Sequence, residues 1–129
     1  MEGVAGYDSI GFSSATTLGT PFTPAGFAKS AWTQVIASTV RDYMGLMCSF
    51  DGQGTNAYYE LAAIDIGLGA SGSEVVLIPD IPAYTAGTAI NGGNGFYPVD
   101  VPSGSRLSVR GAIAYNPPTM GATLYGAYK

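Results

Sequence analysis

Carboxylates are the only conventional catalytic groups that this chain offers, because it contains no histidine and a single cysteine. Without histidine, neither a Ser-His-Asp triad, a Cys-His pair nor a histidine-ligated metal site can form. Asp65 and Glu74 lie on opposite sides of a glycine-rich turn, so a hairpin would bring them near each other. A close pair of carboxyl groups is what glycosidases use for acid–base chemistry.

The same carboxylates also have a structural interpretation, which the sequence favours. Arg106 and Arg110 share one side of a segment that alternates strictly between polar and apolar residues. Opposite charges on neighbouring strands stabilise a sheet by about 0.2–1 kcal/mol per pair. Nothing nearby marks a water-binding cleft or a second acid tuned for proton donation. We therefore expect structural charge pairs, no catalytic residues and no enzymatic activity, with the pairs drawn from Asp65, Glu74, Arg106 and Arg110.

Gly67 to Gly72, GLGASG, matches the dinucleotide-binding fingerprint G-x-G-x-x-G. That motif needs a helix to begin at its third glycine, so that pyrophosphate meets free backbone N–H groups. Here the continuation SEVVLI is rich in β-branched residues and stops at Pro79, which favours a strand. We expect a hairpin turn and no cofactor. No Asp or Asn run has the dense spacing of a calcium loop, so we expect no metal.

Aromatic residues are a further candidate for function, since the chain has nine Tyr, five Phe and one Trp. Tyr suits interfaces because it buries a large rigid surface and keeps a polar tip. Several of these rings could instead fill a sandwich core, and the sequence leaves both interpretations open. The candidate interface residues are Phe12, Phe22, Phe27, Tyr84, Phe96 and Tyr97.

The composition indicates a surface that other molecules cover. The 129 residues are enough for one domain with its own core. Only 11% of them are charged, against roughly 25% in typical soluble domains, while 47% are hydrophobic. The net charge of −4 and five scattered basic residues argue against nucleic acid and a charged membrane surface as partners. We expect the chain to contact copies of itself or a larger assembly.

Period-two alternation predicts strands along most of the chain. Phe96 to Val101 and Arg106 to Tyr115 flank a Pro-Ser-Gly-Ser turn and are predicted to form a hairpin, with Leu107, Val109 and Ile113 on its buried face. Seven or eight strands separated by turn signals indicate an antiparallel sandwich, jelly-roll-like in its connections. The other predicted strands and loops are strands at 14–18, 31–39 (where a short helix is the alternative), 43–50, 58–66, 73–78 and 122–128, and a glycine-rich loop at 83–95. In the 43–50 strand one face carries Met44, Leu46, Cys48 and Phe50. In the 58–66 strand the inward residues are Ala62, Ile64 and Ile66, and the outward residues are Leu61, Ala63 and Asp65.

Residues 1–30 are rich in Gly, Ser, Thr and Pro, with three phenylalanines among them. We expect an extended N-terminal arm over 1–30, ordered by lying on a surface, and a single sandwich domain over 31–129. The N-terminus lacks the basic and apolar regions of a secretory signal, and the apolar runs are too short to cross a bilayer. The sequence therefore predicts a chain made in the cytoplasm, with no signal peptide or transmembrane segment.

Two blocks of the chain carry a recognisable motif. The first block, DIGLGASGSEVVLIP, runs from Asp65 to Pro79, and the second, PVDVPSGSRLSVR, runs from Pro98 to Arg110. Together they resemble a family of small β-rich structural proteins of tailed bacteriophages. The resemblance covers roughly residues 60–110 and implies structural motif residues rather than an active site. It implies a virion component, either a capsid decoration or a head/tail accessory subunit, whose partners are copies of itself and other virion proteins. The alternative is a carbohydrate-binding, receptor-recognition module of a tail or fibre, which would use the 83–97 segment to hold a glycan.

Overall fold

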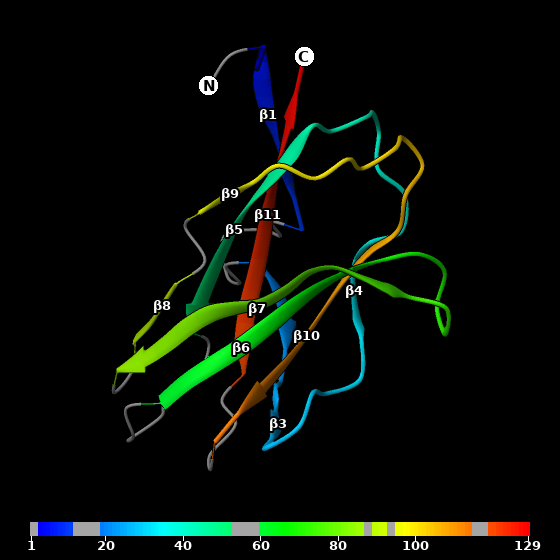
Figure 1. Ribbon diagram of the computed structural model, residues 1–129. Helices are drawn as coiled ribbons and strands as arrows, with labels where there is room; N and C mark the ends of the chain where they lie inside the picture. The colour runs from blue at the N-terminus through cyan, green and yellow to red at the C-terminus, as the bar shows by residue number, and fades with distance from the viewer. Residues whose placement is uncertain (1–2, 12–18, 53–59, 87–88, 93–94, 115–118) are drawn as a thin grey trace.

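The computed structural model describes residues 3–11, 19–52, 60–86, 89–92, 95–114 and 119–129, and its strands form two sheets (Figure 1). In these residues the backbone forms strands and no helix. The strands are β1 (Gly6–Ile10), β2 (Thr20–Phe22), β3 (Ala25–Gly26), β4 (Thr33–Ile36), β5 (Gly45–Gly52), β6 (Glu60–Leu68), β7 (Val75–Ala86), β8 (Ala89–Gly92), β9 (Phe96–Tyr97), β10 (Leu107–Ile113) and β11 (Met120–Tyr128). The predicted all-β, two-sheet architecture is confirmed, whereas the jelly-roll connectivity stays a prediction.

The first sheet is built around the C-terminal strand β11. Its strand order is β1-β11-β5-β9, and β2 also pairs with β11. β1 and β2 follow one another along the same edge of β11, with Ile10 opposite Leu124 and Thr20 opposite Ala122. On its other side β11 pairs with β5 over eight residues, from Met120 to Ala127.

The second sheet is built around β10 and β6. Its strand order is β3-β10-β6-β7-β8, and β4 also pairs with β10. All its pairings are antiparallel except that of β3 with β10, which is parallel. The segment before residue 37 therefore supplies short edge strands to both sheets, and β8 and β9 do the same on the opposite side.

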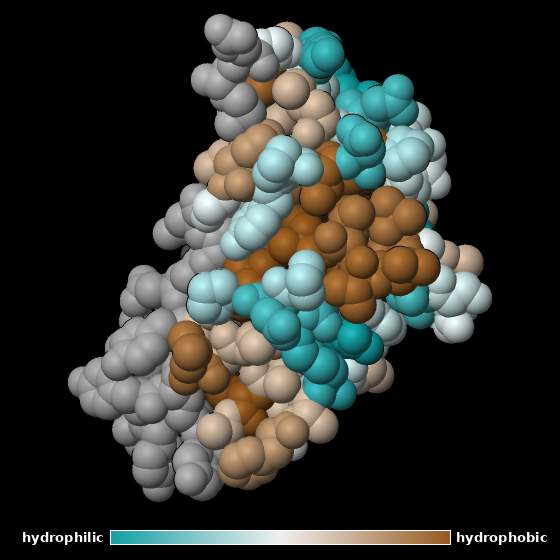
Figure 2. Space-filling view, in the orientation of Figure 1, coloured by the Kyte–Doolittle hydropathy of each residue, from teal (hydrophilic) through white to brown (hydrophobic). Residues whose placement is uncertain are grey.

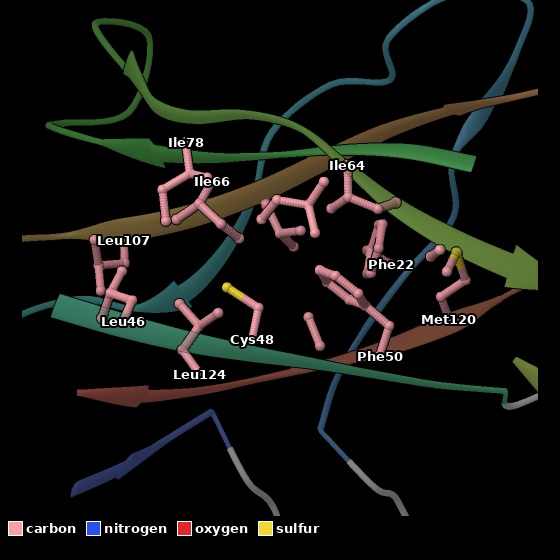
Figure 3. Packing of buried hydrophobic residues seen from close by; sticks show 14 of the residues in the cluster. Phe22, Leu46, Cys48, Phe50, Ile64, Ile66, Ile78, Leu107, Met120 and Leu124 are labelled. Atoms are coloured by element: carbon pink, nitrogen blue, oxygen red, sulfur yellow. The ribbon is translucent and has the colours of Figure 1, made fainter. Parts of the chain in front are cut away.

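The core lies between the two sheets, as Figure 3 shows for the labelled side chains of β5, β6, β10 and β11. Because successive strand residues point to opposite faces, alternate positions fill this space. The predicted inward residues of β5, β6 and β10 are buried, namely Leu46, Cys48, Phe50, Ala62, Ile64, Ile66, Leu107, Val109 and Ile113. Burying one large apolar side chain contributes about 1.5–3 kcal/mol, more than a typical surface ion pair. The core is therefore the main source of stability.

Residues 1–30 are part of this sandwich wherever the structure describes them. β1 and β2 are hydrogen-bonded to β11, and β3 pairs with β10. The boundary predicted at residue 30 falls between β3 and β4, which both pair with β10, and the division into an arm and a domain stays a prediction. The strand predicted at residues 14–18 lies outside the described residues.

The predicted hairpin of Phe96 to Val101 with the Arg106 strand is wrong. β9 pairs with β5 in the first sheet, whereas β10 belongs to the second sheet. The turn itself is present, since the Ser105 N–H donates to the Pro102 carbonyl at 3.2 Å and Gly104 has φ +83°. Its role differs from the prediction, because Val101 bridges to Tyr43 and so commits the segment before the turn to the first sheet.

Two further boundaries differ from the prediction. β7 continues through Pro79 and Pro82 to Ala86, because proline is tolerated at a sheet edge and beside irregular pairing. The β6–β7 register shifts near Ile66, and Asp80 has φ +52°. The predicted 83–95 loop contains the end of β7 and all of β8, and β4 is shorter than the predicted 31–39 strand.

Candidate functional site

Asp65 is the centre of a charge cluster on the outer face of the second sheet. Its Oδ1 accepts a hydrogen bond from Lys29 Nζ at 2.6 Å and one from the Asp80 backbone N–H at 2.9 Å. Its Oδ2 accepts from Arg110 Nε at 2.9 Å. Lys29 also pairs with Asp80 at 2.7 Å. One carboxylate thus joins β6, β10, the irregular part of β7 and the segment between β3 and β4.

This cluster is covered although it lies on the outer face. The Asp65 side chain is only 4% exposed, because the segment that carries Lys29 and Trp32 crosses above it. The Arg110 guanidinium carbon lies 4.3 Å from the centroid of the Trp32 ring, which is within cation–π range. The Trp32 ring in turn packs on the bare backbone of Gly67, where an added Cβ would approach it to 2.7 Å.

Hydrogen bonding outweighs burial in setting the ionisation of Asp65. Burial by itself raises the pKa of this carboxyl. The hydrogen bonds from Lys29, the Asp80 N–H and Arg110 lower the pKa by more than burial raises it, so the pKa lies below its ordinary value. The pKa of Lys29 is raised for the complementary reason, since its bonds to Asp65 and Asp80 outweigh the effect of burial. Both groups are therefore held in their charged forms.

A second cluster joins Arg106 to the tip of the β6–β7 hairpin. Arg106 Nη1 donates to Glu74 Oε1 at 2.9 Å, to the Gly69 carbonyl at 3.2 Å and to Ser108 Oγ at 2.7 Å. Its Nε donates to Gln34 Oε1 at 2.9 Å. Hydrogen bonds from the Glu74 and Gly72 backbone N–H groups, together with Arg106, hold the Glu74 pKa below its usual range.

These contacts match the structural interpretation of the four charged residues. Asp65 is bonded to Arg110, whereas Glu74 is bonded to Arg106, so the two carboxylates have different partners. A glycosidase needs one carboxyl group with a raised pKa to donate a proton. Both pKa values are shifted the opposite way here, and nothing in this geometry prepares either group to act as an acid.

A third cluster involves residues that the sequence analysis did not single out. Asp8 Oδ2 accepts from Arg41 Nε at 2.8 Å and from the Tyr43 hydroxyl at 2.9 Å. The Arg41 guanidinium lies 4.0 Å from the Tyr128 ring centroid. Burial, followed by the bond to Asp8, raises the pKa of Tyr43 to about 12. These residues are far apart in the sequence, and no local spacing signals their contact.

Beside this third cluster is an open pocket of about 490 Å³. Basic, acidic and tyrosine side chains line this pocket. The lining residues are Arg41, Asp42, Tyr43, Met44, Asp100, Tyr128 and Lys129. The Tyr43 side chain is buried, and Arg41 occupies a face of the Tyr128 ring. The part of the chain that the structure describes contains no group of three or more residues suited to hold a metal ion.

The predicted interface residues do not form one surface. Phe22 is buried in the core against Phe50, with ring centroids 6.3 Å apart, so its place in the interface set is corrected. Phe27 is 75% exposed at the end of β3. Phe96 packs on Gly45, and Tyr97 packs on the core. Phe12 and the side chain of Tyr84 lie outside the described residues.

Exposed apolar side chains lie at two separate places on the second sheet, at the start of β6 and at the start of β7, which are opposite ends of the paired strands. Leu61 on β6 is 65% exposed, and Val75 and Val76 on β7 are 68% and 38% exposed. Figure 2 shows apolar side chains gathered where the start of β7 passes the segment between β9 and β10. The period-two alternation correctly places Leu61 on the outer face, but it could not predict that Val75 and Val76 are both exposed, because they are adjacent in the strand.

The Gly67 to Gly72 motif forms the hairpin turn that the sequence favours. Gly69 and Gly72 have φ values of +126° and +85°, and the Ser73 N–H donates to the Ala70 carbonyl at 2.9 Å. The chain then enters β7 rather than a helix. The backbone therefore lacks the helix N-terminus that a dinucleotide phosphate would need.

Comparison of the chain with models of known protein families, with curated proteins and with solved structures found no match. In the part of the chain that the structure describes, no helix has the length and apolar character needed to cross a lipid bilayer.

Proposed function

We propose that this chain is a non-enzymatic structural subunit of a virion, a capsid decoration or head/tail accessory protein. It would act by packing against copies of itself and other virion proteins. The observation that carries this proposal is the distribution of charge and apolar surface. Four of the five basic residues, Lys29, Arg41, Arg106 and Arg110, form ion pairs within the chain, while Leu61, Val75 and Val76 face outward.

This distribution suits association between proteins. The core of a protein interface is depleted in charged side chains, and large exposed apolar patches mark interaction sites. Because the arginines are occupied, the surface offers little to an anionic ligand. The chain instead offers apolar side chains on a rigid two-sheet framework.

The two sequence blocks that resemble phage structural proteins support the virion role. The first block contains Asp65 and Glu74, and the second contains Arg106 and Arg110. The ion pairs Asp65–Arg110 and Glu74–Arg106 join one block to the other at 2.9 Å each. The shared motif thus corresponds to a three-dimensional unit made of β6, β7 and β10.

The carbohydrate-binding alternative has weaker support. Its predicted 83–97 segment is largely strand, and the described pocket near Tyr128 has a ring face occupied by Arg41. A sugar stacks on an open aromatic face, which this pocket does not supply through Tyr128. Saturable glycan binding by the purified chain would reverse this ranking.

The proposal is tested by quantitative mass spectrometry of virions purified from the source that encodes this chain. We expect the chain in a fixed stoichiometric ratio to the major capsid or tail protein. A matched lysate fraction without virions is the control. Intact virions that lack the chain would contradict the proposal.

A further inference from the structure

The start of β7 is an open sheet edge. From Val75 to Thr85 the strand pairs with β6 on one side, with two register shifts, but β8 pairs only with residues 83–86 on the other. Within the described residues, the stretch from Val75 to Pro82 therefore has no ladder partner on its second side. Strand edges of this kind carry backbone N–H and C=O groups that can accept another strand.

Side chains around this open edge are apolar. Val75 and Val76 are exposed, Leu77 is partly buried and Ile78 is buried. Soluble proteins commonly protect open edges with lysine, bulges or very short strands. The opposite edge of the same sheet follows that rule, because β3 has two residues and β4 has four. Val75–Ile78 carries no charged side chain, and its one irregularity is the register shift against β6 that leaves Leu77 without a partner between the pairs Ile66–Ile78 and Gly67–Val76.

The limits of the open edge are also defined. Proline cannot donate a backbone hydrogen bond, so Pro79 ends the regular edge, and Asp80 with φ +52° departs from it. At the other end, the chain turns at Gly72. Four residues, Val75 to Ile78, are therefore available for strand pairing.

We propose that Val75–Ile78 pairs antiparallel with the same segment of a second copy, so that the second sheet continues across a two-fold axis. An antiparallel pairing is self-complementary, as a two-fold interface requires. The two nearest ionic side chains are already neutralised, Glu74 by Arg106 and Asp80 by Lys29. Two copies therefore meet without repulsion between like charges, whereas a charged foreign strand would find no complementary charge.

This inference rests on the proposed function and names one of its contacts. It assigns the self-association to an edge rather than to a face of the second sheet. Leu61 provides the distinction, because it is equally apolar and well exposed but lies on β6, which is paired on both sides by β7 and β10.

Sedimentation equilibrium of the full chain and of two matched variants tests the inference. We expect the wild type to form a dimer and Val76→Lys to raise the dissociation constant by about tenfold or more, because like charges then meet across the pairing. Leu61→Lys adds the same charge to the same sheet and should leave the constant unchanged. A wild type that stays monomeric at millimolar concentration, or equal weakening by both variants, overturns the edge pairing.

Amide hydrogen exchange of the wild-type protein gives a test that does not depend on a variant folding. The backbone amides of Val76 and Leu77 should gain protection as the protein concentration rises, while those of exposed turns such as Ser103 should not. Concentration-independent exchange at Val76 and Leu77 overturns the inference. Virions that contain the chain, combined with a failed edge test, would leave the proposed function standing without this contact.

Discussion

At the scale of single residues, Asp65 shows how one carboxylate can organise several segments. Sequence alternation places it on the outer face of β6, where a solvated side chain is the ordinary outcome. Instead it accepts hydrogen bonds from Lys29, Arg110 and the Asp80 backbone N–H, and it is nearly inaccessible to solvent. Removing one partner of a buried ion pair is costly because the remaining charges stay desolvated.

Asp65→Asn is predicted to lower the free energy of unfolding at pH 7 by about 2–4 kcal/mol. The amide keeps an oxygen acceptor but removes the charge that balances Lys29 and Arg110. Urea unfolding measures the change, and Asp100→Asn, at an exposed carboxylate, is the matched control. A cost no larger than that of the control would show that the cluster adds nothing to stability.

The stability difference between the wild type and Asp65→Asn is predicted to depend on pH. The pKa of Asp65 in the folded protein lies below the ordinary value of an aspartate, so its stabilising effect is present above that ordinary pKa and is lost as the pH falls through the folded pKa. Glu74 shifts in the same direction and adds to the loss in acid. The stability difference between wild type and Asp65→Asn should therefore be constant above about pH 5 and shrink below about pH 4. A difference that persists unchanged at pH 3 would contradict the lowered pKa.

Among the strands, β6 makes room for the segment between β3 and β4 at a glycine, Gly67. Gly67 has no side chain, and the Trp32 ring occupies the space above it. Trp32 also stacks with Arg110, which in turn bonds to Asp65. The glycine, the ring and the charge cluster therefore hold the same crossing segment.

Gly67→Ala is predicted to displace the Trp32 ring, because the new Cβ would lie 2.7 Å from it. Overpacking of this kind typically costs about 1–3 kcal/mol. Trp32 is the only tryptophan, so its fluorescence should shift to longer wavelength in the variant. The Trp32→Ala background is the control, in which Gly67→Ala should cost less, and equal costs in both backgrounds would rule out the steric explanation.

At the scale of the whole molecule, chain segments cross between the sheets on both sides of the sandwich. On one side the chain passes from β2 to β3, and on the other from β8 to β9. Short strands therefore pair with part of each edge. Within the described residues, the start of β7 and the part of β5 beyond Met47 have no partner strand on that side. On each side, two consecutive strands are hydrogen-bonded to different sheets, β2 and β3 on one side and β8 and β9 on the other. Because these strands tie the two sheets together, we expect the sandwich to unfold as one unit.

Cys48 is predicted to report that cooperative unfolding. It lies in the core, and burial raises the pKa of its thiol to about 12, so little reactive thiolate exists at pH 8. Labelling by a thiol reagent should therefore follow the same urea transition as Trp32 fluorescence, which probes the outer face of the second sheet. Rapid labelling in native buffer, or a transition at lower urea than that of Trp32, would contradict unfolding as a single unit.

The local features of this protein follow from its amino-acid sequence alone. Period-two alternation identified the apolar buried residues of β5, β6 and β10, although Asp65 and Ser108 on the polar side are buried as well. The glycine positions identified the turns before β7 and β10. Both succeed because side-chain direction and turn geometry depend on neighbouring residues. Only the tertiary structure decided that β9 and β10 belong to different sheets, that Asp65 is covered by Lys29 and that Val75 begins an open edge. Those outcomes depend on which distant segments share the core and the sheet edges, and local periodicity carries no information about that choice.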